Sequence, residues 1–304
     1  MEAMEAPTPP PGAGSSGGHW QDEHVRFERA GHLYFWRGNL ILRPSVSSVY
    51  KKYFVMFDNR KKVEAEYGYW KQNKENKYRP LIAYCLQVLG KDDKFAQEAI
   101  LSLWESDGKI AADAGSYMHD QFDNWWLGKA VDPIPELTIF EKWFHAFNKH
   151  AEWELYATEK ILVKMHPKVD ELVVWAGSSD LILKHRVKAD TYALIDYKRI
   201  RQPQLGAEPF EQFSKGKDAK GTGPFTRVDN NKTGYYTIQL NMYAFTLYHD
   251  YGIDCRNNLY LLQFYGHTPV NQVKVPYLAA EMESLFAIEA ADTLREFAKS
   301  PSDF

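Results

Sequence analysis

Two apolar runs, Asp180–His185 and Tyr192–Tyr197, flank a short polar turn and constrain the fold more than any other feature of the chain. Their length and their Leu and Ile content predict two neighbouring strands of a buried sheet. If the turn centres on Lys188, Asp180 and Asp196 are direct cross-strand neighbours. Two carboxylates so close together in apolar surroundings repel each other unless a cation or a proton lies between them.

A lysine completes this candidate site. Lys198 lies two residues after Asp196, so the period of a strand puts both side chains on one face of the sheet. Its side chain can orient or deprotonate an attacking water, the latter only as a neutral amine, while a metal held by the aspartates supplies Lewis acidity. Carboxylate oxygens favour Mg²⁺ or Mn²⁺ over zinc. Because Asp-x-Lys arises often by chance, an exposed ion pair at a strand end is the alternative interpretation.

The order of predicted elements defines the fold class. Residues 60–150 are expected to be mostly helical, with separate helices over 94–104 and 109–127. From Trp153 onward the pattern changes to strands, then helix, strands and a closing helix. The strands are expected over 155–163, 172–175, 180–185, 192–197, 259–265 and 270–275, and the helices over 235–251 and 278–299. This order predicts an α/β fold: a small mixed sheet flanked by helices, with an N-terminal helical lobe.

Composition bounds the domain organisation and the cellular compartment. Residues 1–19 are rich in Pro, Gly and Ser and predict a disordered tail. Residues 20–304 are expected to form one domain, with a hairpin and helical lobe over 20–150 and the core over 151–304. The absence of a signal peptide and of a membrane-spanning apolar run favours a soluble intracellular protein. Two cysteines are too few for a four-cysteine metal site and favour a reducing compartment.

Three further residues are candidates for the site. His119 lies on the predicted helix 109–127, and Asp123, one turn later, could orient its imidazole. A lone helical histidine is usually structural, so only its combination with the hairpin makes His119 a candidate metal ligand. Glu159, near the start of the strand-rich part, could join the acidic site or face solvent.

The helix expected over 235–251 carries a second polar pair. Gln239 and Tyr243 are four residues apart and therefore share one helix face. An uncharged amide and an aromatic ring suit the sugar–phosphate edge and the bases near a scissile bond. The alternative is a satisfied polar pair in a helix–sheet interface.

Basic residues concentrate in one stretch of an acidic chain. Residues 184–234 hold eleven Lys and Arg against six Asp and Glu, whereas the whole chain has a net charge of −3. This distribution favours a focused polyanion-binding surface over a chain that is basic throughout. A solvated charged loop is the alternative.

The motifs together resemble the PD-(D/E)XK nuclease superfamily, specifically its RecB-like exonuclease branch as found in large DNA viruses and phages. The resemblance covers roughly residues 25–290, and its motifs follow the family's order. They are Ala114-Gly-Ser-Tyr-Met-His119, Thr158-Glu159, Gly177-Ser-Ser-Asp180, Asp196-Tyr-Lys198 and Gln239-Leu-Asn-Met-Tyr243. One departure is Asp196, where many members carry Glu.

The resemblance implies a four-stranded mixed sheet and a Mg²⁺-dependent DNA exonuclease, with Mn²⁺ as a substitute. Such an enzyme acts on single-stranded ends or flaps in replication, repair or recombination. The implied metal ligands are His119, Asp180, Asp196 and the carbonyl oxygen of Tyr197, with Lys198 as the catalytic lysine. The implied DNA contacts are Gln239, Tyr243, Ser178 and Arg199. The cysteines that hold an iron–sulfur cluster in some relatives are absent from the sequence, so no cluster is expected.

Three alternatives stay open at this point. A structure-specific endonuclease of the same fold would use the same residues. A nucleic-acid-binding protein that has lost catalysis, or a protein whose aromatic residues bind something else, is the second alternative, although the intact set of Asp180, Asp196 and Lys198 argues against decay. A hydrolase of small phosphate esters would need only the metal site.

Overall fold

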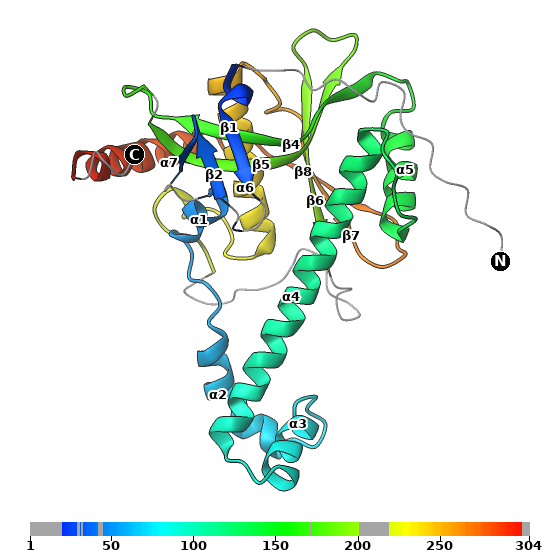
Figure 1. Ribbon diagram of the computed structural model, residues 1–304, viewed down its shortest axis with the longest axis vertical. Helices are drawn as coiled ribbons and strands as arrows, with labels where there is room; N and C mark the ends of the chain where they lie inside the picture. The colour runs from blue at the N-terminus through cyan, green and yellow to red at the C-terminus, as the bar shows by residue number, and fades with distance from the viewer. Residues whose placement is uncertain are drawn as a thin grey trace, which may run out of the picture. The chain divides into compact units, whose positions relative to one another are not determined.

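A computed structural model describes residues 20–28, 31, 33–41, 45–170, 172–200 and 219–299 (Figure 1). The predicted tail over 1–19 and most of the polar connection after Ile200 lie outside these residues. The chain separates into two compact units. Unit 1 comprises residues 1–55 and 117–304, and unit 2 comprises Met56–Ser116.

A five-stranded mixed sheet is the centre of unit 1. Its strands follow in sequence order, and all neighbours are antiparallel except β6 and β7, which are parallel. The strands are β4 (Trp153–Met165), β5 (Val173–His185), β6 (Tyr192–Arg199), β7 (Leu259–Phe264) and β8 (Asn271–Val275). The sheet thus has one strand more than the resemblance implies. The α/β class predicted from the sequence is confirmed.

One face of this sheet is covered by three helices, α1 (Val46–Lys51), α6 (Lys232–Tyr251) and α7 (Ala279–Lys299) (Figure 1). Ile182 and Leu194 contribute the sheet side of this core, as alternation along a strand requires. The N-cap of α1 is Ser45, whose side chain accepts a hydrogen bond from the Ser48 N–H.

The opposite face is covered by α5 (Pro135–Phe147) and by the last part of α4 (Asp93–Trp126). Leu183, Ile195 and Tyr197 are among the sheet residues of this second core. Adjacent residues of β6 therefore belong to different cores. Asp196 and Lys198 alternate with Ile195 and Tyr197, so their side chains lie on the face of the sheet that α6 covers.

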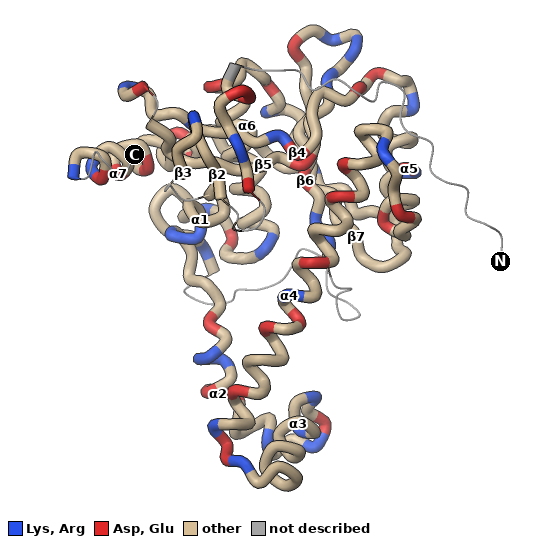
Figure 2. The backbone as a smooth tube through the Cα atoms, viewed as in Figure 1, with Lys and Arg blue, Asp and Glu red and all other residues tan. Residues whose placement is uncertain are grey.

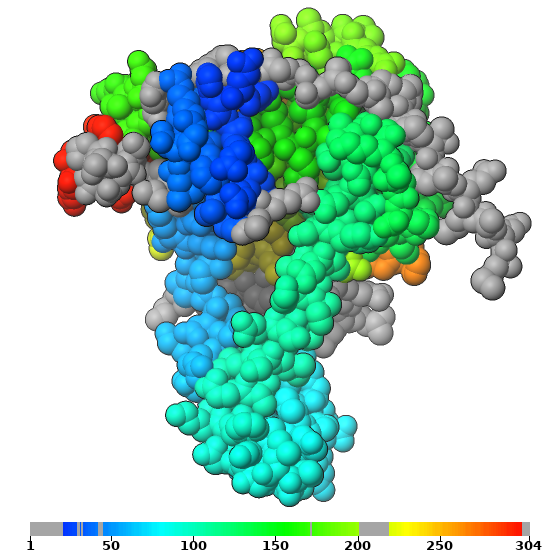
Figure 3. Space-filling view, in the orientation of Figure 1, coloured from blue at the N-terminus to red at the C-terminus, as the bar shows by residue number. Residues whose placement is uncertain are grey.

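A small three-stranded sheet precedes the main fold. It comprises β1 (Val25–Glu28), β2 (Leu33–Trp36) and β3 (Asn39–Leu40), and a short 3₁₀ helix, Trp20–Glu23, leads into it. Trp36 and Tyr34 pack against Val163 and Ala176 of the main sheet. In Figure 3 these N-terminal strands, in blue, lie on the surface of unit 1.

Unit 2 is a helical unit with its own core. Its helices are α2 (Asn59–Gln72), α3 (Arg79–Ala83), the π-helical turn Tyr84–Val88 and the first part of α4. Val63, Trp70, Ile82 and Ile100 are buried together there. Within the described residues, none of the helices in either unit is long and apolar enough to span a membrane.

Two predicted boundaries are wrong. The expected strands 172–175 and 180–185 form one strand, β5, because Gly177 continues the strand instead of starting a turn. The expected helices 94–104 and 109–127 form one helix, α4. Its Gly108 faces open space, and one exposed helical glycine costs only about 1 kcal/mol relative to alanine.

Candidate metal centre and active site

The hairpin of β5 and β6 brings Asp180 and Asp196 to one place. Its register pairs Leu181 with Ile195 and Lys184 with Tyr192, as a turn centred on Lys188 requires. Continuing this register places the two aspartates opposite each other, and both are buried. The Tyr197 N–H donates a hydrogen bond to Asp180 Oδ2 across 2.5 Å. The predicted juxtaposition of the two carboxylates is therefore present.

Glu159 reaches the same place from β4. Thr158 pairs with Leu181 and Lys160 with Ser179, so Glu159 lies opposite Asp180. Its φ of 46° is in the left-handed region, which costs a residue other than glycine about 1–3 kcal/mol. The Ser178 hydroxyl donates to Glu159 Oε2 across 3.3 Å. The strained backbone of Glu159 inside a strand therefore points to a role of its carboxylate beyond packing.

His119 connects these carboxylates to β6. Its Nδ1 lies 3.4 Å from Glu159 Oε1 and 3.5 Å from Asp180 Oδ1, and its Nε2 lies 3.2 Å from the Tyr197 carbonyl oxygen. His119, Glu159 and Asp180 each offer one ligand atom, and these atoms all lie within 4.8 Å of one another. This spacing fits three ligands around one cation.

The charges of the group depend on one another. Burial lowers the pKa of His119, but Asp180 and Glu159 outweigh that effect and raise this pKa to about 9. Burial raises the pKa of Asp180. Burial also raises the pKa of Asp196, to about 6, although the neighbouring ammonium of Lys198 opposes this shift. Without a metal, the protonated imidazole supplies the positive charge that the buried carboxylates need.

Lys198 forms an ion pair with Asp196 Oδ2. Within the described residues, Asp196 Oδ1 has no hydrogen-bond partner although it is fully buried. Burial alone lowers the pKa of Lys198, but Asp196 and Asp180 raise it well above its usual value, so the side chain is an ammonium group. Its Nζ lies 5.1 Å from the ring centroid of Tyr236.

The polar pair of α6 lies beside the site strand. Gln239 Nε2 donates to the Tyr243 hydroxyl across 3.0 Å. The Tyr243 ring is buried and packs on Gly177, where an added Cβ would lie 2.6 Å from Tyr243 Cε1. Tyr243 therefore packs in the interface between α6 and the sheet, which was the alternative to a DNA contact. Gln239 remains partly exposed.

Two predicted site residues have other surroundings. Arg199 Nε donates to Oε1 of the buried Glu136 across 2.8 Å, so its guanidinium anchors α5. In the described part of the chain, the polar contacts of His119 are with Glu159, Asp180 and Tyr197, and Asp123 is not among them. The basic residues at 201, 215 and 217 lie outside the described residues.

Two residues near Lys198, Tyr236 and Gln263, are not among the site residues predicted from the sequence. Tyr236 precedes Gln239 by three residues, and the helical period would have placed both on one face. Gln263 is the one polar residue of the six in β7, and the parallel register pairs it with Lys198. Its side chain is fully buried, accepts a hydrogen bond from Asn271, and has no described partner for Nε2.

The chain matches none of the known protein-family models and none of the curated proteins. Its function is therefore inferred from the geometry and chemistry of this site.

Proposed function

We propose that this protein is a metal-dependent nuclease of the PD-(D/E)XK type that hydrolyses phosphodiester bonds of DNA. We infer single-stranded ends or flaps as its substrate, in replication, repair or recombination. The observation that carries the proposal is the convergence of His119, Glu159 and Asp180 beside the buried ion pair of Asp196 and Lys198. A structural role would not require so many charged groups in one buried place.

The donor set fits a hard divalent cation. Two carboxylates, one imidazole and the carbonyl oxygen of Tyr197 suit Mg²⁺ or Mn²⁺. The ligands would be His119, Glu159, Asp180 and the Tyr197 carbonyl oxygen, with the free Oδ1 of Asp196 available beside them. Glu159 thereby becomes a ligand candidate instead of an auxiliary acid. A bound divalent cation supplies Lewis acidity and lowers the pKa of a coordinated water.

Lys198 would act on the substrate as a charged donor. Its raised pKa keeps the ammonium group protonated at neutral pH, so it can donate to a phosphate oxygen or orient a water. Asp196 holds this ammonium group in place from the same face of β6. Gln239, on the facing helix, offers an uncharged donor to the sugar–phosphate backbone.

The proposal includes a reducing compartment and no iron–sulfur cluster, and the surroundings of the two cysteines bear on both. Cys85 is buried in the core of unit 2, and Cys255 is buried in unit 1. Both are free thiols surrounded by apolar side chains. This environment suits structural packing rather than cluster ligation.

Hydrolysis of end-labelled single-stranded DNA in Mg²⁺ or Mn²⁺ tests the proposal. We expect Asp196→Asn and Lys198→Ala to lose at least about 100-fold in rate, as removal of one electrostatic group at a reacting centre does. Equal rates of hydrolysis by the wild type and both variants would exclude this mechanism. Covalently closed circular single-stranded DNA separates the two nuclease classes, since an exonuclease leaves it intact and an endonuclease cuts it.

A further inference from the structure

Charge is segregated along unit 2. Residues 56–116 contain ten Lys and Arg and ten Asp and Glu, so the unit as a whole is neutral. Residues 69–95 hold six of the basic residues and three acidic ones, which leaves +3, whereas residues 96–116 carry −3. Figure 2 shows basic segments beside α3, which lies within residues 69–95.

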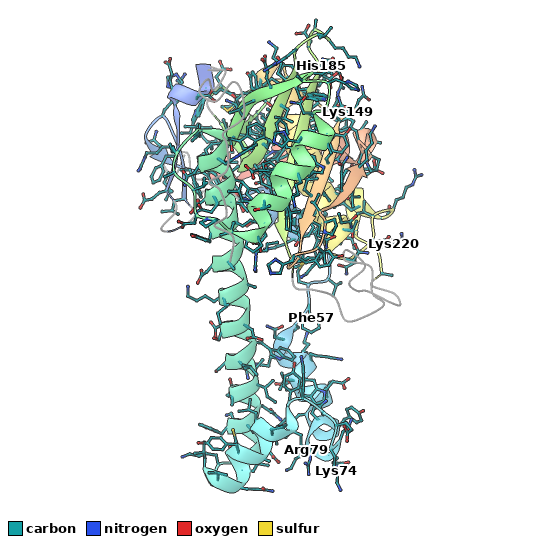
Figure 4. All side chains as sticks on the ribbon, turned by 90° about the vertical axis from the view of Figure 1, so that its right-hand side faces the viewer. Phe57, Lys74, Arg79, Lys149, His185 and Lys220 are labelled. Carbon is teal, nitrogen blue, oxygen red and sulfur yellow. The ribbon has the colours of Figure 1, made fainter. Side chains whose placement is uncertain are left out.

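The basic residues of unit 2 also differ in their pairing. Arg60 lies 2.6 Å from Glu98, and Lys62 lies 3.2 Å from Glu66. In contrast, three cations that follow α2 form no ion pair with any described residue: Lys74, Lys77 and Arg79, the first residue of α3. Figure 4 shows Lys74 and Arg79 near each other at the end of unit 2 away from Phe57. Their charge is therefore available to a polyanion.

Exposed aromatic rings accompany these cations. Tyr69 is 61% exposed and Tyr84 is 51% exposed. Asn73 Nδ2 donates to the Tyr69 hydroxyl across 2.7 Å, which ties this ring to the segment that carries Lys74. Lys77 Nζ lies 4.8 Å from the Tyr78 ring centroid. The stretch from Tyr69 to Tyr84 thus combines positive charge with exposed aromatic rings.

The segment between α2 and α3 is held in one conformation by its own side chains. Asn73 Oδ1 accepts from the Glu75 N–H across 3.0 Å, and Asn76 Oδ1 accepts from the Tyr78 N–H across 2.9 Å. Tyr78 is buried against Trp70 and Trp104. The cations therefore project from a preorganised support, which lowers the entropy cost of binding.

We propose that this surface, made of Tyr69, Lys74, Lys77, Arg79 and Tyr84, is a binding site for single-stranded nucleic acid. The three cations contact successive phosphates, and the two tyrosines stack on unpaired bases. Bases in a duplex already stack on each other, so the tyrosines favour a single strand over a duplex. Binding at this surface requires none of the metal-centre residues and thus goes beyond the proposed hydrolysis.

Fluorescence anisotropy with a labelled oligothymidylate tests the site in the full-length protein carrying Asp196→Asn, which prevents cleavage. Combined substitution of Lys74, Lys77 and Arg79 by Ala is expected to weaken binding at least about 10-fold. It should also reduce the salt slope by about 2, at about 0.7 for each phosphate contact on a single strand. The matched control replaces Arg60, Lys61 and Lys62, which have carboxylate partners, and should bind within about twofold of the parent. Equal affinities of the two triple variants would overturn the proposal.

A second pair of variants tests the stacking. Tyr69→Ala and Tyr84→Ala are expected to weaken single-strand binding about 5-fold or more each and to leave duplex binding unchanged. Equal loss on both DNA forms, or no loss on either, would overturn the stacking role. Circular dichroism confirms that each variant is folded.

The outcome is independent of the proposed nuclease. In the background with Asp196 intact, the Lys74, Lys77 and Arg79 triple variant should hydrolyse a dinucleotide at the wild-type rate, because hydrolysis of that substrate requires only the metal-centre residues. Absence of hydrolysis by the wild type would remove the proposed function. The anisotropy experiment would still decide whether unit 2 binds single strands.

Discussion

The backbone N–H of Tyr197 donates to Asp180 Oδ2 across 2.5 Å, while the carbonyl oxygen of Tyr197 lies 3.2 Å from His119 Nε2. One peptide residue thus orients two candidate ligands. Its side chain points to the opposite face of the sheet, where it packs against Phe122 and Phe140. Because that ring is buried in a close-packed core, the backbone at Tyr197 is a fixed reference for the site.

Asp180→Asn is expected to abolish stabilisation of the protein by Mn²⁺. The amide keeps an acceptor for the Tyr197 N–H, and burial disfavours the charged form of Asp180, so the metal-free variant should stay folded. In the wild type, Mn²⁺ at about 100 times its Kd should add about 2.7 kcal/mol to the free energy of unfolding. Thermal unfolding during an Mn²⁺ titration measures both proteins.

Asp123→Asn is the control for this prediction. Asp123 lies one turn from His119 on α4 but makes no described polar contact with it. Its variant should keep the full rise of Tm with Mn²⁺. A lost response in the Asp123 variant, or a retained response in the Asp180 variant, would contradict the ligand assignment.

Metal binding at pH 7.5 is expected to release about one proton. The imidazole of His119 is protonated in the metal-free site, since its pKa is about 9, and it must be neutral to bind a metal. The apparent enthalpies of Mn²⁺ binding in Tris and in PIPES, measured by calorimetric titration, should differ by about the difference between the ionisation enthalpies of the two buffers. In His119→Asn the two buffers should give the same enthalpy. Identical enthalpies for the wild type would refute the protonated state.

The raised pKa of His119 also predicts how the stability of the protein depends on pH. The pKa of His119 is about 9 in the folded protein and about 6.5 in the unfolded chain, so the folded protein binds the proton more tightly. Its contribution to stability is complete below pH 6.5 and is lost as the pH rises through 9, on the order of 3 kcal/mol. Urea unfolding in EDTA at pH 6, 8 and 10 should show the advantage of wild type over His119→Asn shrinking along this series. A constant advantage would argue against the shift.

The hairpin could be predicted because its information is local. Two apolar runs and one turn determine the register, and a shift by one residue would turn every side chain to the other face. This register and the period of a strand predict that the side chains of Asp180, Asp196 and Lys198 lie close together. The face shared by Gln239 and Tyr243 followed in the same way from the helical period.

The rest depends on contacts between distant segments. Nothing near Glu159 in the sequence indicates its positive φ, which turns the carboxylate toward His119. Arg199 is the first residue of the basic segment after Asp-x-Lys, and the sequence predicts it to contact DNA. Its partner Glu136 lies 63 residues earlier in the chain, on a helix that the hairpin alone could not place.

Gly177→Ala is expected to destabilise unit 1 by about 1–3 kcal/mol, the cost of overpacking a core. An added Cβ would lie 2.6 Å from Tyr243 Cε1 and 3.1 Å from Val46 Cγ2, so the ring must move. That movement also disturbs the hydrogen bond from Gln239. Urea unfolding measures the loss, and Gly177→Ala combined with Tyr243→Leu should recover part of it.

Gly108→Ala provides the matched control for backbone effects. Gly108 lies inside α4, and apart from its chain neighbours and the adjacent helix backbone no described atom lies within 4 Å of an added Cβ. Alanine there should stabilise the helix by about 0.5–1 kcal/mol. The two glycine variants should therefore shift stability in opposite directions, and a stabilised Gly177→Ala would show that the Tyr243 ring is free to move.

Arg199→Ala is expected to destabilise unit 1 by about 1–2 kcal/mol. It leaves the buried carboxylate of Glu136 without its cation, and the cost is limited because the Arg199 side chain is itself 35% exposed. Adding Glu136→Gln should restore most of the loss, which a double-mutant cycle in urea measures. If Arg199→Ala instead leaves stability unchanged and lowers the salt slope of single-strand binding by about 0.7, Arg199 contacts a phosphate, as the nuclease resemblance implies.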